Sequence, residues 1–182
     1  MGDKTDLQDV TFLIGLKIDS IERLENILMV IDFIYHHFDT NIHVLETAKY
    51  NNGIVHKLLP QNVSYRFIED YDPILHHTKY TNKLVKNCCT PYIAVWDADV
   101  IIDPQQIITA VEWLRRNKAD FVSPYKNKAL DTSRIIRELY YKTRDINVLK
   151  TNKGKMEEMY APNPVGGGFF ANKAKYLEAG ME

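Results

Sequence analysis

The chain has 182 residues, with 23 Lys and Arg against 24 Asp and Glu, and 45% of its residues are hydrophobic. This composition excludes disordered, collagen-like and coiled-coil chains and fits one globular domain over residues 1–182. Because the charges are dispersed and sum to −1, binding of nucleic acid or anionic lipid through bulk electrostatics is not expected.

Three features indicate a cytoplasmic location, and they are compatible with peripheral contact at the inner face of the membrane. Cys88 and Cys89 are adjacent, which suits a reducing compartment better than a disulfide framework. The longest apolar stretch, 27–34, is well short of the roughly 20 residues that cross a bilayer. Residues 1–9 do not have the pattern of a signal peptide.

The first half of the chain alternates strand-like and helix-like segments. Thr11–Leu16 is an apolar run, typical of a strand buried on both faces of a parallel sheet. Asp19 and Glu22 have the spacing of a capping box, which predicts a helix whose apolar stripe reaches Phe38. We further expect strands at 42–45 and 63–68, a helix at 79–87, and at 92–96 the strongest strand of the chain.

The second half continues this alternation. Asp103 is expected to cap a helix that begins at Pro104. The predicted elements that follow are a strand at 121–123, a helix at 135–146, a mobile charged loop at 150–161, a strand at 165–170 and a helix at 173–179. Basic residues on the helix at 135–146 are interpreted as a solvated face. Together the elements predict a three-layer α/β/α fold with a mostly parallel central sheet.

Two carboxylates follow the strongest predicted strand. Asp97 and Asp99 are two residues apart, so in an extended segment they project to the same side. In open α/β sheets the ligand crevice lies beyond the carboxyl ends of the strands. Carboxylate oxygens suit hard divalent cations, and substrate phosphates often complete the shell. The pattern therefore predicts a Mn²⁺ or Mg²⁺ site.

The segment YIAVWDADVII, residues 92–102, resembles the D-x-D segment of family 2 glycosyltransferases, which have the GT-A fold. The first strand and helix, with Asp19, Arg23 and Asn26, are similar to the chondroitin-polymerase and galactosyltransferase branch, and the ending at 165–182 resembles that family's glycine-rich segment. The likeness spans nearly the whole chain. The chain departs from the family at Gly15, Glu46 and Leu84.

The resemblance implies a metal-assisted, inverting transfer of a sugar from a nucleotide-diphosphate donor, expected to be a UDP-sugar, to a glycan or lipid-linked acceptor. It places the catalytic base beyond Glu182, so residues 1–182 are expected to be a truncated catalytic domain. The implied nucleotide-binding residues are Leu16, Lys17, Asp19, Glu46, Lys79, Asn82 and Asp97; the metal ligands are Asp99 and Asp97; the sugar and acceptor residues are Trp96, Gly166, Gly167 and Gly168.

Other interpretations stay open. The D-A-D-V pattern also resembles the first motif of haloacid-dehalogenase-like phosphatases, although that motif belongs on the first core strand. A non-catalytic nucleotide-sugar or glycan binding module fits the same residues. Asp103 alone predicts only a helix cap, and Trp96 is more typical of the core or a crevice wall than of a sugar platform. The histidine pairs 36–37 and 76–77 lack the spacing of metal ligands.

Overall fold

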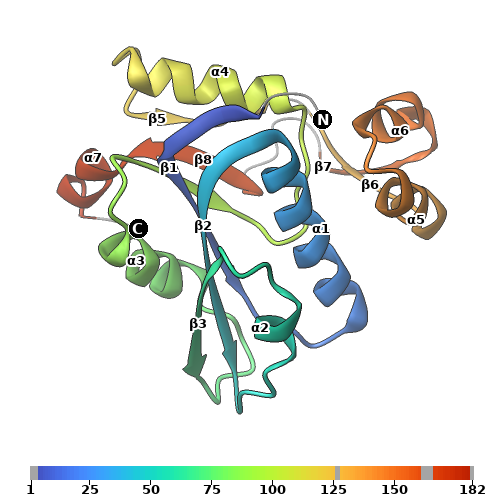
Figure 1. Cartoon of the computed structure of the whole chain (residues 1–182), viewed down its shortest axis with the longest axis horizontal. Coiled ribbons are helices and arrows are strands. Elements are labelled where there is room, and N and C mark those ends of the chain that lie inside the picture. The colour runs from blue at the N-terminus through green and yellow to red at the C-terminus, as the bar shows by residue number, and fades with distance from the viewer. Residues whose placement is uncertain (1–3, 126–127, 161–165, 181–182) are drawn as a thin grey trace. The chain divides into compact units, whose positions relative to one another are not determined.

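The computed structural model describes residues 4–125, 128–160 and 166–180. The chain divides into two compact units, and each is described by itself. The first unit combines residues 1–124 with residues 167–182, and the second comprises residues 125–166. Most of the helices and strands of both units are labelled in Figure 1.

The first unit contains, among its described residues, a six-stranded sheet with the order β3-β2-β1-β4-β8-β5. Neighbours pair in parallel from β3 to β4, whereas β8 is antiparallel to both β4 and β5. The carboxyl ends of β1 to β4 and the start of β8 therefore meet at one edge, called here the carboxyl edge. The strands are β1 (Thr5–Leu16), β2 (Phe38–Ala48), β3 (Ser64–Glu69), β4 (Tyr92–Trp96), β5 (Phe121–Val122) and β8 (Gly168–Asn172).

Helices cover both faces of this sheet. In Figure 1, α3 and α7 lie on one face and α1 and α4 on the other, which confirms the predicted three-layer architecture with a mostly parallel sheet. The helices of the first unit are α1 (Ile21–His37), α2 (Ile54–Leu58), α3 (His77–Asn87), α4 (Pro104–Arg115) and α7 (Lys173–Glu178).

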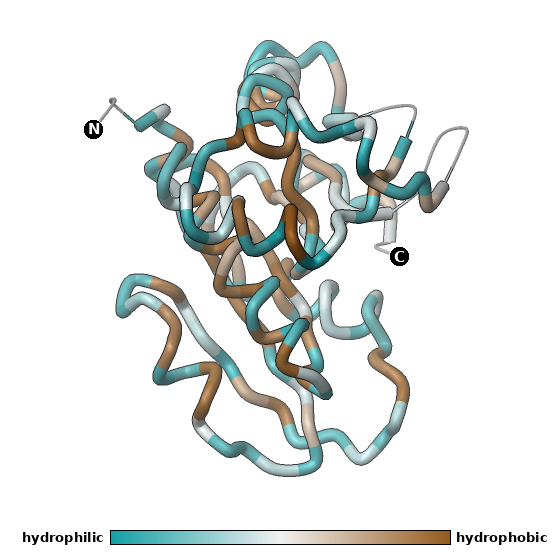
Figure 2. Tube along the Cα trace, turned by 90° about the vertical axis from the view of Figure 1, so that its right-hand side faces the viewer, coloured by the Kyte–Doolittle hydropathy of each residue, from teal (hydrophilic) through white to brown (hydrophobic). Residues whose placement is uncertain are grey.

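The core lies between the sheet and the helices on each face. Alternate strand residues such as Leu13 and Val95 pack with Leu84 of α3 on one face. On the other face the rings of Phe12, Trp96 and Phe170 meet edge to face, with centroids 5.5–5.8 Å apart. Figure 2 shows the apolar residues concentrated along the central strands, with hydrophilic residues in many of the loops.

Helix capping differs from the sequence prediction at α1 and agrees with it at α4. The side chain of Ser20, not Asp19, caps α1 by accepting a hydrogen bond from the Arg23 N–H at 3.2 Å. The predicted capping box of Asp19 and Glu22 was therefore wrong by one residue. Asp103 caps α4 as predicted, because its Oδ1 accepts from the Gln105 N–H at 3.1 Å.

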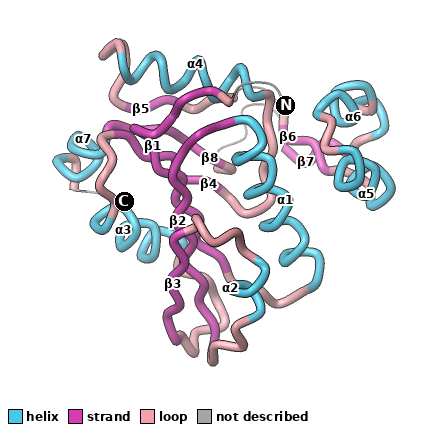
Figure 3. The backbone as a smooth tube through the Cα atoms, viewed as in Figure 1, coloured by secondary structure: helices cyan, strands magenta, loops and turns pink. Residues whose placement is uncertain are grey.

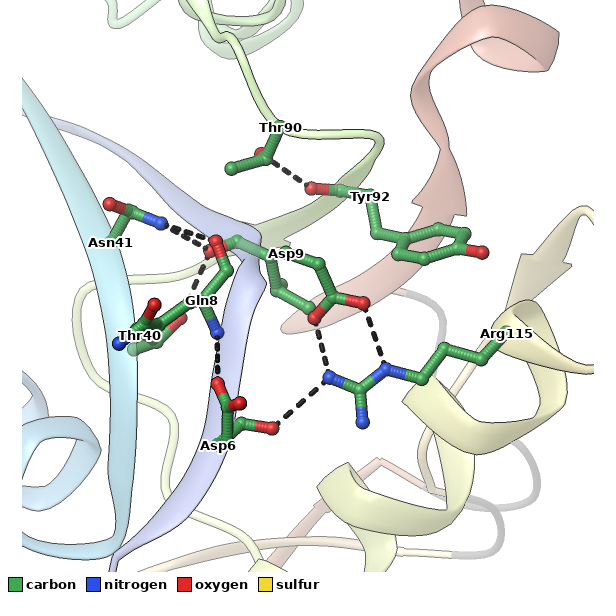
Figure 4. Close-up of polar contacts among 9 residues, drawn as sticks. Asp6, Gln8, Asp9, Thr40, Asn41, Thr90, Tyr92 and Arg115 are labelled. Atoms are coloured by element: carbon green, nitrogen blue, oxygen red, sulfur yellow. Dashed lines mark hydrogen bonds and ion pairs between the residues drawn. The ribbon is translucent and has the colours of Figure 1, made fainter.

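A polar cluster ties α4 to the amino-terminal part of β1, away from the carboxyl edge (Figure 4). The guanidinium of Arg115 donates Nε to one oxygen of Asp9 at 2.8 Å and Nη2 to the other at 2.5 Å. Thr40 and Asn41 of β2 donate to the Val10 carbonyl at 3.0 and 3.2 Å, where the register of β1 shifts. These contacts fix the irregular start of β1 and leave the carboxyl edge free for other residues.

The second unit contains α5 (Arg134–Thr143), α6 (Ile146–Thr151), a 3₁₀ turn (Lys153–Lys155) and an antiparallel pair, β6 (Ala129–Asp131) and β7 (Glu157–Tyr160). The helix predicted at 135–146 ends early because Arg144 takes a positive φ of 55° and donates its N–H to the Tyr140 carbonyl at 2.8 Å. Asp145 then caps α6. The loop predicted at 150–161 was also wrong, since most of it is ordered in α6, the turn and β7 (Figure 3).

Two predicted boundaries fall on residues outside the described part of the chain, Ala161 and Val165. The strand predicted at 165–170 is β8, which begins at Gly168 and continues to Asn172. Within the described ranges, no helix combines the length and apolarity needed to cross a membrane.

Candidate functional site

The carboxylate of Asp97 is fixed at the carboxyl edge by the start of β8. The Asp97 N–H donates to the Gly167 carbonyl at 3.1 Å, and the Gly167 N–H donates back to Asp97 Oδ2 at 3.1 Å. Gly167 has a positive φ of 81°, a conformation that glycine adopts without steric cost. The backbone N–H of Gly167 thus orients one carboxylate oxygen of Asp97, a predicted metal ligand.

His77 meets the other oxygen of Asp97. Its Nε2 lies 3.4 Å from Asp97 Oδ1, and both side chains are partly exposed. His77 is the first residue of α3, so β4, β8 and α3 converge at this carboxylate. The sequence prediction gave His77 no role, because 20 residues separate it from Asp97 and its spacing to His76 carries no signal.

The loop between β3 and α3 is tied to the end of β1. Lys17 Nζ donates to the carbonyl of Asp72, and the Asp72 carboxylate lies 2.7 Å from His76 Nε2. This hydrogen bond to His76 holds the pKa of Asp72 below its ordinary value. Lys17, a predicted nucleotide-binding residue, therefore anchors the loop that leads into α3. The role of Asp72 was missed by sequence reasoning.

Lys79 lies on the exposed side of α3. It lines a shallow hollow of about 400 Å³ together with His76, His77 and Thr78. Its ammonium group is 5.0 Å from the centre of the Tyr80 ring, a cation–π contact. The structure thus brings the predicted residue Lys79 to the same hollow as His77.

Glu46 and Asn82 have protein partners in this structure. Glu46 is 3% exposed, and its Oε2 accepts from the Tyr65 hydroxyl at 2.6 Å. Burial, and then this bond, raises the pKa of Tyr65. Asn82 Oδ1 accepts from the Tyr176 hydroxyl at 2.9 Å, which links α3 to α7. The roles predicted for Glu46 and Asn82 toward a nucleotide stay predictions.

Trp96 belongs to the core and not to the surface that would meet a sugar. It is 0% exposed, and its indole N–H donates to the Val100 carbonyl at 3.0 Å. Gly168 is buried against it, because a Cβ at Gly168 would stand 2.6 Å from Trp96 Cε3. The expectation that Trp96 contacts the sugar or the acceptor is corrected by this burial, since a fully enclosed ring has no free face. Gly168 makes room for the indole.

The remaining predicted residues lie at several places. Leu16 is buried at the end of β1, with 3% exposure. Asp19 is exposed and pairs with Arg23 at 3.2 Å. Gly166 is exposed, has a φ of 107° and is the last residue of the second unit.

Asp99 is exposed in the segment that follows β4. Among the described residues, no group of three or more His, Cys, Asp and Glu is placed to hold a metal ion. The donor set still fits Mg²⁺ or Mn²⁺, because such ions are often held by one or two carboxylates together with substrate phosphates. Asp97 and Asp99 suit a metal that arrives with its ligand rather than an ion in an all-protein cage.

Comparison with known proteins gives matches at the level of structure. No family model matches the chain, and no curated protein matches its sequence. The glucosyl-3-phosphoglycerate synthase of M. tuberculosis superposes with a TM-score of 0.52 at 14% identity, over 91% of this chain and 57% of that protein. The fold is of the GT-A type. The chain thus spans little more than half the length of that neighbour.

Two other solved structures have the same arrangement. CMP:2-keto-3-deoxy-manno-octonic acid synthetase complexed with CTP has a TM-score of 0.54 at 10% identity, over 95% of this chain and 78% of that protein. S. aureus TarS, residues 1–349, has a TM-score of 0.50 at 14% identity, over 94% and 49%. The mycobacterial synthase has also been solved with Mn²⁺, UDP-glucose and phosphoglyceric acid, and with Mg²⁺ and UDP. At these identities the likeness is one of fold.

Proposed function

We propose that this chain is a nucleotide-sugar-dependent glycosyltransferase that binds a UDP-sugar together with Mn²⁺ or Mg²⁺ at the carboxyl edge of its sheet. The observation that carries the proposal is Asp97, held at the end of β4 by Gly167 and met by His77. Structures of similar fold with bound UDP, UDP-glucose and divalent metals support it. A location in the cytoplasm is part of the proposal.

The residues at the edge have distinct parts in this proposal. Asp99 and Asp97 hold the metal, which when bound neutralises negative charge on the diphosphate. Lys79 and His77 line one hollow, His77 contacts Asp97, and both side chains attract the phosphates. Glu46 serves the nucleoside end, with Tyr65 orienting its carboxylate. In the proposed transfer the acceptor hydroxyl attacks the anomeric carbon with inversion, the bond from that carbon to the diphosphate breaks, and UDP leaves. The acceptor is a glycan or a lipid-linked glycan, and the base that takes its hydroxyl proton is assigned to no residue described here.

Calorimetry of UDP binding tests the metal part of the proposal. Binding in Mn²⁺ should weaken at least tenfold when EDTA is added, as expected for a charge bridge of about 1.4 kcal/mol or more. Asp99→Asn should bind UDP equally in both conditions. Asp39→Asn is the matched control, because Asp39 is an exposed aspartate at the start of β2, far along the strand from the carboxyl edge. UDP binding that is indifferent to metal in the parent protein contradicts the proposal.

His77 should contribute to donor binding. We expect His77→Ala to weaken UDP binding by at least about tenfold, because a hydrogen bond to a charged group contributes about 1.5–3 kcal/mol. His36→Ala is the control, since His36 is an exposed histidine in the last turn of α1, at the opposite end of that helix from the carboxyl edge. Equal affinities for the two variants in the same titration would remove His77 from the site while leaving the metal ligands in place.

Two other functions were considered from the sequence. In a haloacid-dehalogenase-like phosphatase the aspartate motif follows the first core strand, whereas Asp97 follows β4, the fourth strand along the chain. This position disfavours the phosphatase. A non-catalytic nucleotide-sugar or glycan binding module remains the alternative, because the residues at the carboxyl edge that would bind a donor fit such a module equally well. Metal-dependent UDP binding without hydrolysis or transfer of a UDP-sugar by the natural full-length protein would support the module.

A further inference from the structure

Helix α5 of the second unit is apolar on two sides. Ile136 and Tyr140 are buried within the structure, at 6% and 2% exposure. Ile135 and Leu139 are instead 80% and 45% exposed. Residues four apart lie above one another on a helix, so these two aliphatic side chains form one exposed strip. Ordinary amphipathic helices present polar residues at such positions.

Basic side chains border this strip. Arg134 and Lys142 line the same shallow hollow as Ile135 and Leu139, with Glu138 as the one acidic residue among them. We call the surface formed by Arg134, Ile135, Glu138, Leu139 and Lys142 the α5 face.

The charge of the second unit differs from that of the rest of the chain. Residues 125–166 contain nine Lys and Arg and five Asp and Glu, whereas the remaining residues contain 14 and 19. The net charge of −1 for the whole chain is therefore the sum of +4 for residues 125–166 and −5 for the remaining residues. The surplus of cations belongs to the same unit as the exposed aliphatic strip.

We propose that the α5 face binds the surface of a membrane that contains anionic lipid. A helix with basic and apolar side chains on its exposed side can insert the apolar ones at the headgroup boundary while its cations pair with lipid phosphates. A protein partner fits less well, because a stable interface buries at least about 1,000 Å² and the exposed apolar strip consists of two side chains. The contact is weak and salt-sensitive, since its charges are exposed.

This proposal does not depend on the proposed transferase activity. Vesicle binding requires no nucleotide, so its failure leaves the donor site untouched, and failure of UDP binding leaves the α5 face untouched. From the composition of the whole chain, binding to anionic lipid through bulk electrostatics was not expected. The α5 face changes this expectation, because residues 125–166 are basic although the whole chain is nearly neutral.

Cosedimentation of the full chain with vesicles tests the proposal. One set of vesicles is an equimolar mixture of phosphatidylglycerol and phosphatidylcholine, and the other is phosphatidylcholine alone. The parent protein should bind the first set, bind the second weakly or not at all, and be released from the first by salt. Ile135→Ser with Leu139→Ser, and separately Arg134→Gln with Lys142→Gln, should each weaken binding at least about tenfold.

The matched controls carry the same changes in the first unit. Ile21→Ser with Ile54→Ser replaces isoleucines that are 71% and 48% exposed, and Lys49→Gln with Lys57→Gln replaces exposed lysines. Both controls should bind like the parent. The proposal is overturned if the parent ignores anionic vesicles, binds neutral ones equally well, or loses binding equally in the controls. It is also overturned if light scattering shows that the serine pair abolishes a dimer while vesicle binding persists, because the occupant is then a second copy.

Discussion

Gly168 and Trp96 show how a glycine near the site serves packing. A methyl group at Gly168 would overlap the indole, with 2.6 Å between the new Cβ and Trp96 Cε3. We expect Gly168→Ala to lower the free energy of unfolding by about 1–3 kcal/mol, the usual cost of overpacking a core. Urea denaturation measures this loss.

Gly15→Ala is the control for that substitution. Gly15 lies in β1, which β4 separates from β8, and no atom stands within 4 Å of its added Cβ. Its effect on the free energy of unfolding should be small, because a strand tolerates alanine at least as well as glycine. If both variants lose equal stability, the close approach to Trp96 is not the reason for Gly168.

His43 of β2 should make stability depend on pH. Burial lowers its pKa below the ordinary value of about 6.5, so the unfolded chain binds a proton more readily than the folded chain. Its contribution is complete above about pH 6.5 and is lost as the pH falls through that value toward the lower folded-state pKa.

Urea denaturation at pH 7.5 and at pH 5 measures the effect of His43. The parent protein should be less stable at the lower pH, and His43→Gln should reduce the difference. Some pH dependence should remain, because burial and the neighbouring His36 also lower the pKa of His37. His56→Gln, on exposed α2, is the control. An unchanged pH dependence in His43→Gln would show that His43 does not contribute to it.

At the scale of single elements, substitutions of Asp103 test whether this residue only caps a helix or also belongs to the functional site. It accepts from the Gln105 N–H at the start of α4. We expect Asp103→Ala to cost about 1 kcal/mol of stability and Asp103→Asn to cost little, because asparagine caps helices nearly as well as aspartate. Thermal unfolding of the two variants checks this. UDP affinity should stay unchanged in both, and a loss of affinity in Asp103→Asn would place Asp103 in the site.

Elements with strong periodicity could be predicted from the sequence, whereas their ends depended on local hydrogen bonds. The strand at 92–96 was predicted with its observed bounds, since its β-branched and aromatic residues are buried between two helical layers. The helix at 135–146 was predicted too long, because Arg144 in a left-handed conformation ends α5 and nothing in its residue type signals this. The strand pair β6–β7 was missed because each strand has at most four residues, too few for a clear alternating pattern.

The candidate site could be predicted only where a motif lies at the end of a strand. Asp97 was found because it follows an apolar run, and the structure places it at the carboxyl edge. His77 was missed, since its partner Asp97 comes from another element, and the contact of Asp72 with Lys17 was missed, since 55 residues separate the two. The partnership of Glu46 with Tyr65 arises from the pairing of β2 with β3, which a single sequence does not reveal.

At the scale of the whole molecule, the net charge and composition of the full chain did not show that it divides into two units of different charge. The chain is nearly neutral overall, yet residues 125–166 are basic and form their own compact unit. Overall composition treats the chain as one body, so it could not show that the basic unit also carries the exposed strip of α5, with Arg134 and Lys142 lining the same hollow. The fold class, in contrast, was predicted and is confirmed by the sheet order and by the structural neighbours.

The central claim is that a nucleoside diphosphate and a divalent metal bind together at the carboxyl edge of the sheet. A crystal structure of the natural protein grown with UDP and Mn²⁺, with anomalous diffraction data collected for manganese, tests it most directly. The account predicts an anomalous peak within bonding distance of a carboxylate oxygen of Asp99 or Asp97, with the diphosphate on its other side near Lys79 and His77. A UDP molecule bound elsewhere, or a manganese peak away from both aspartates, would contradict it.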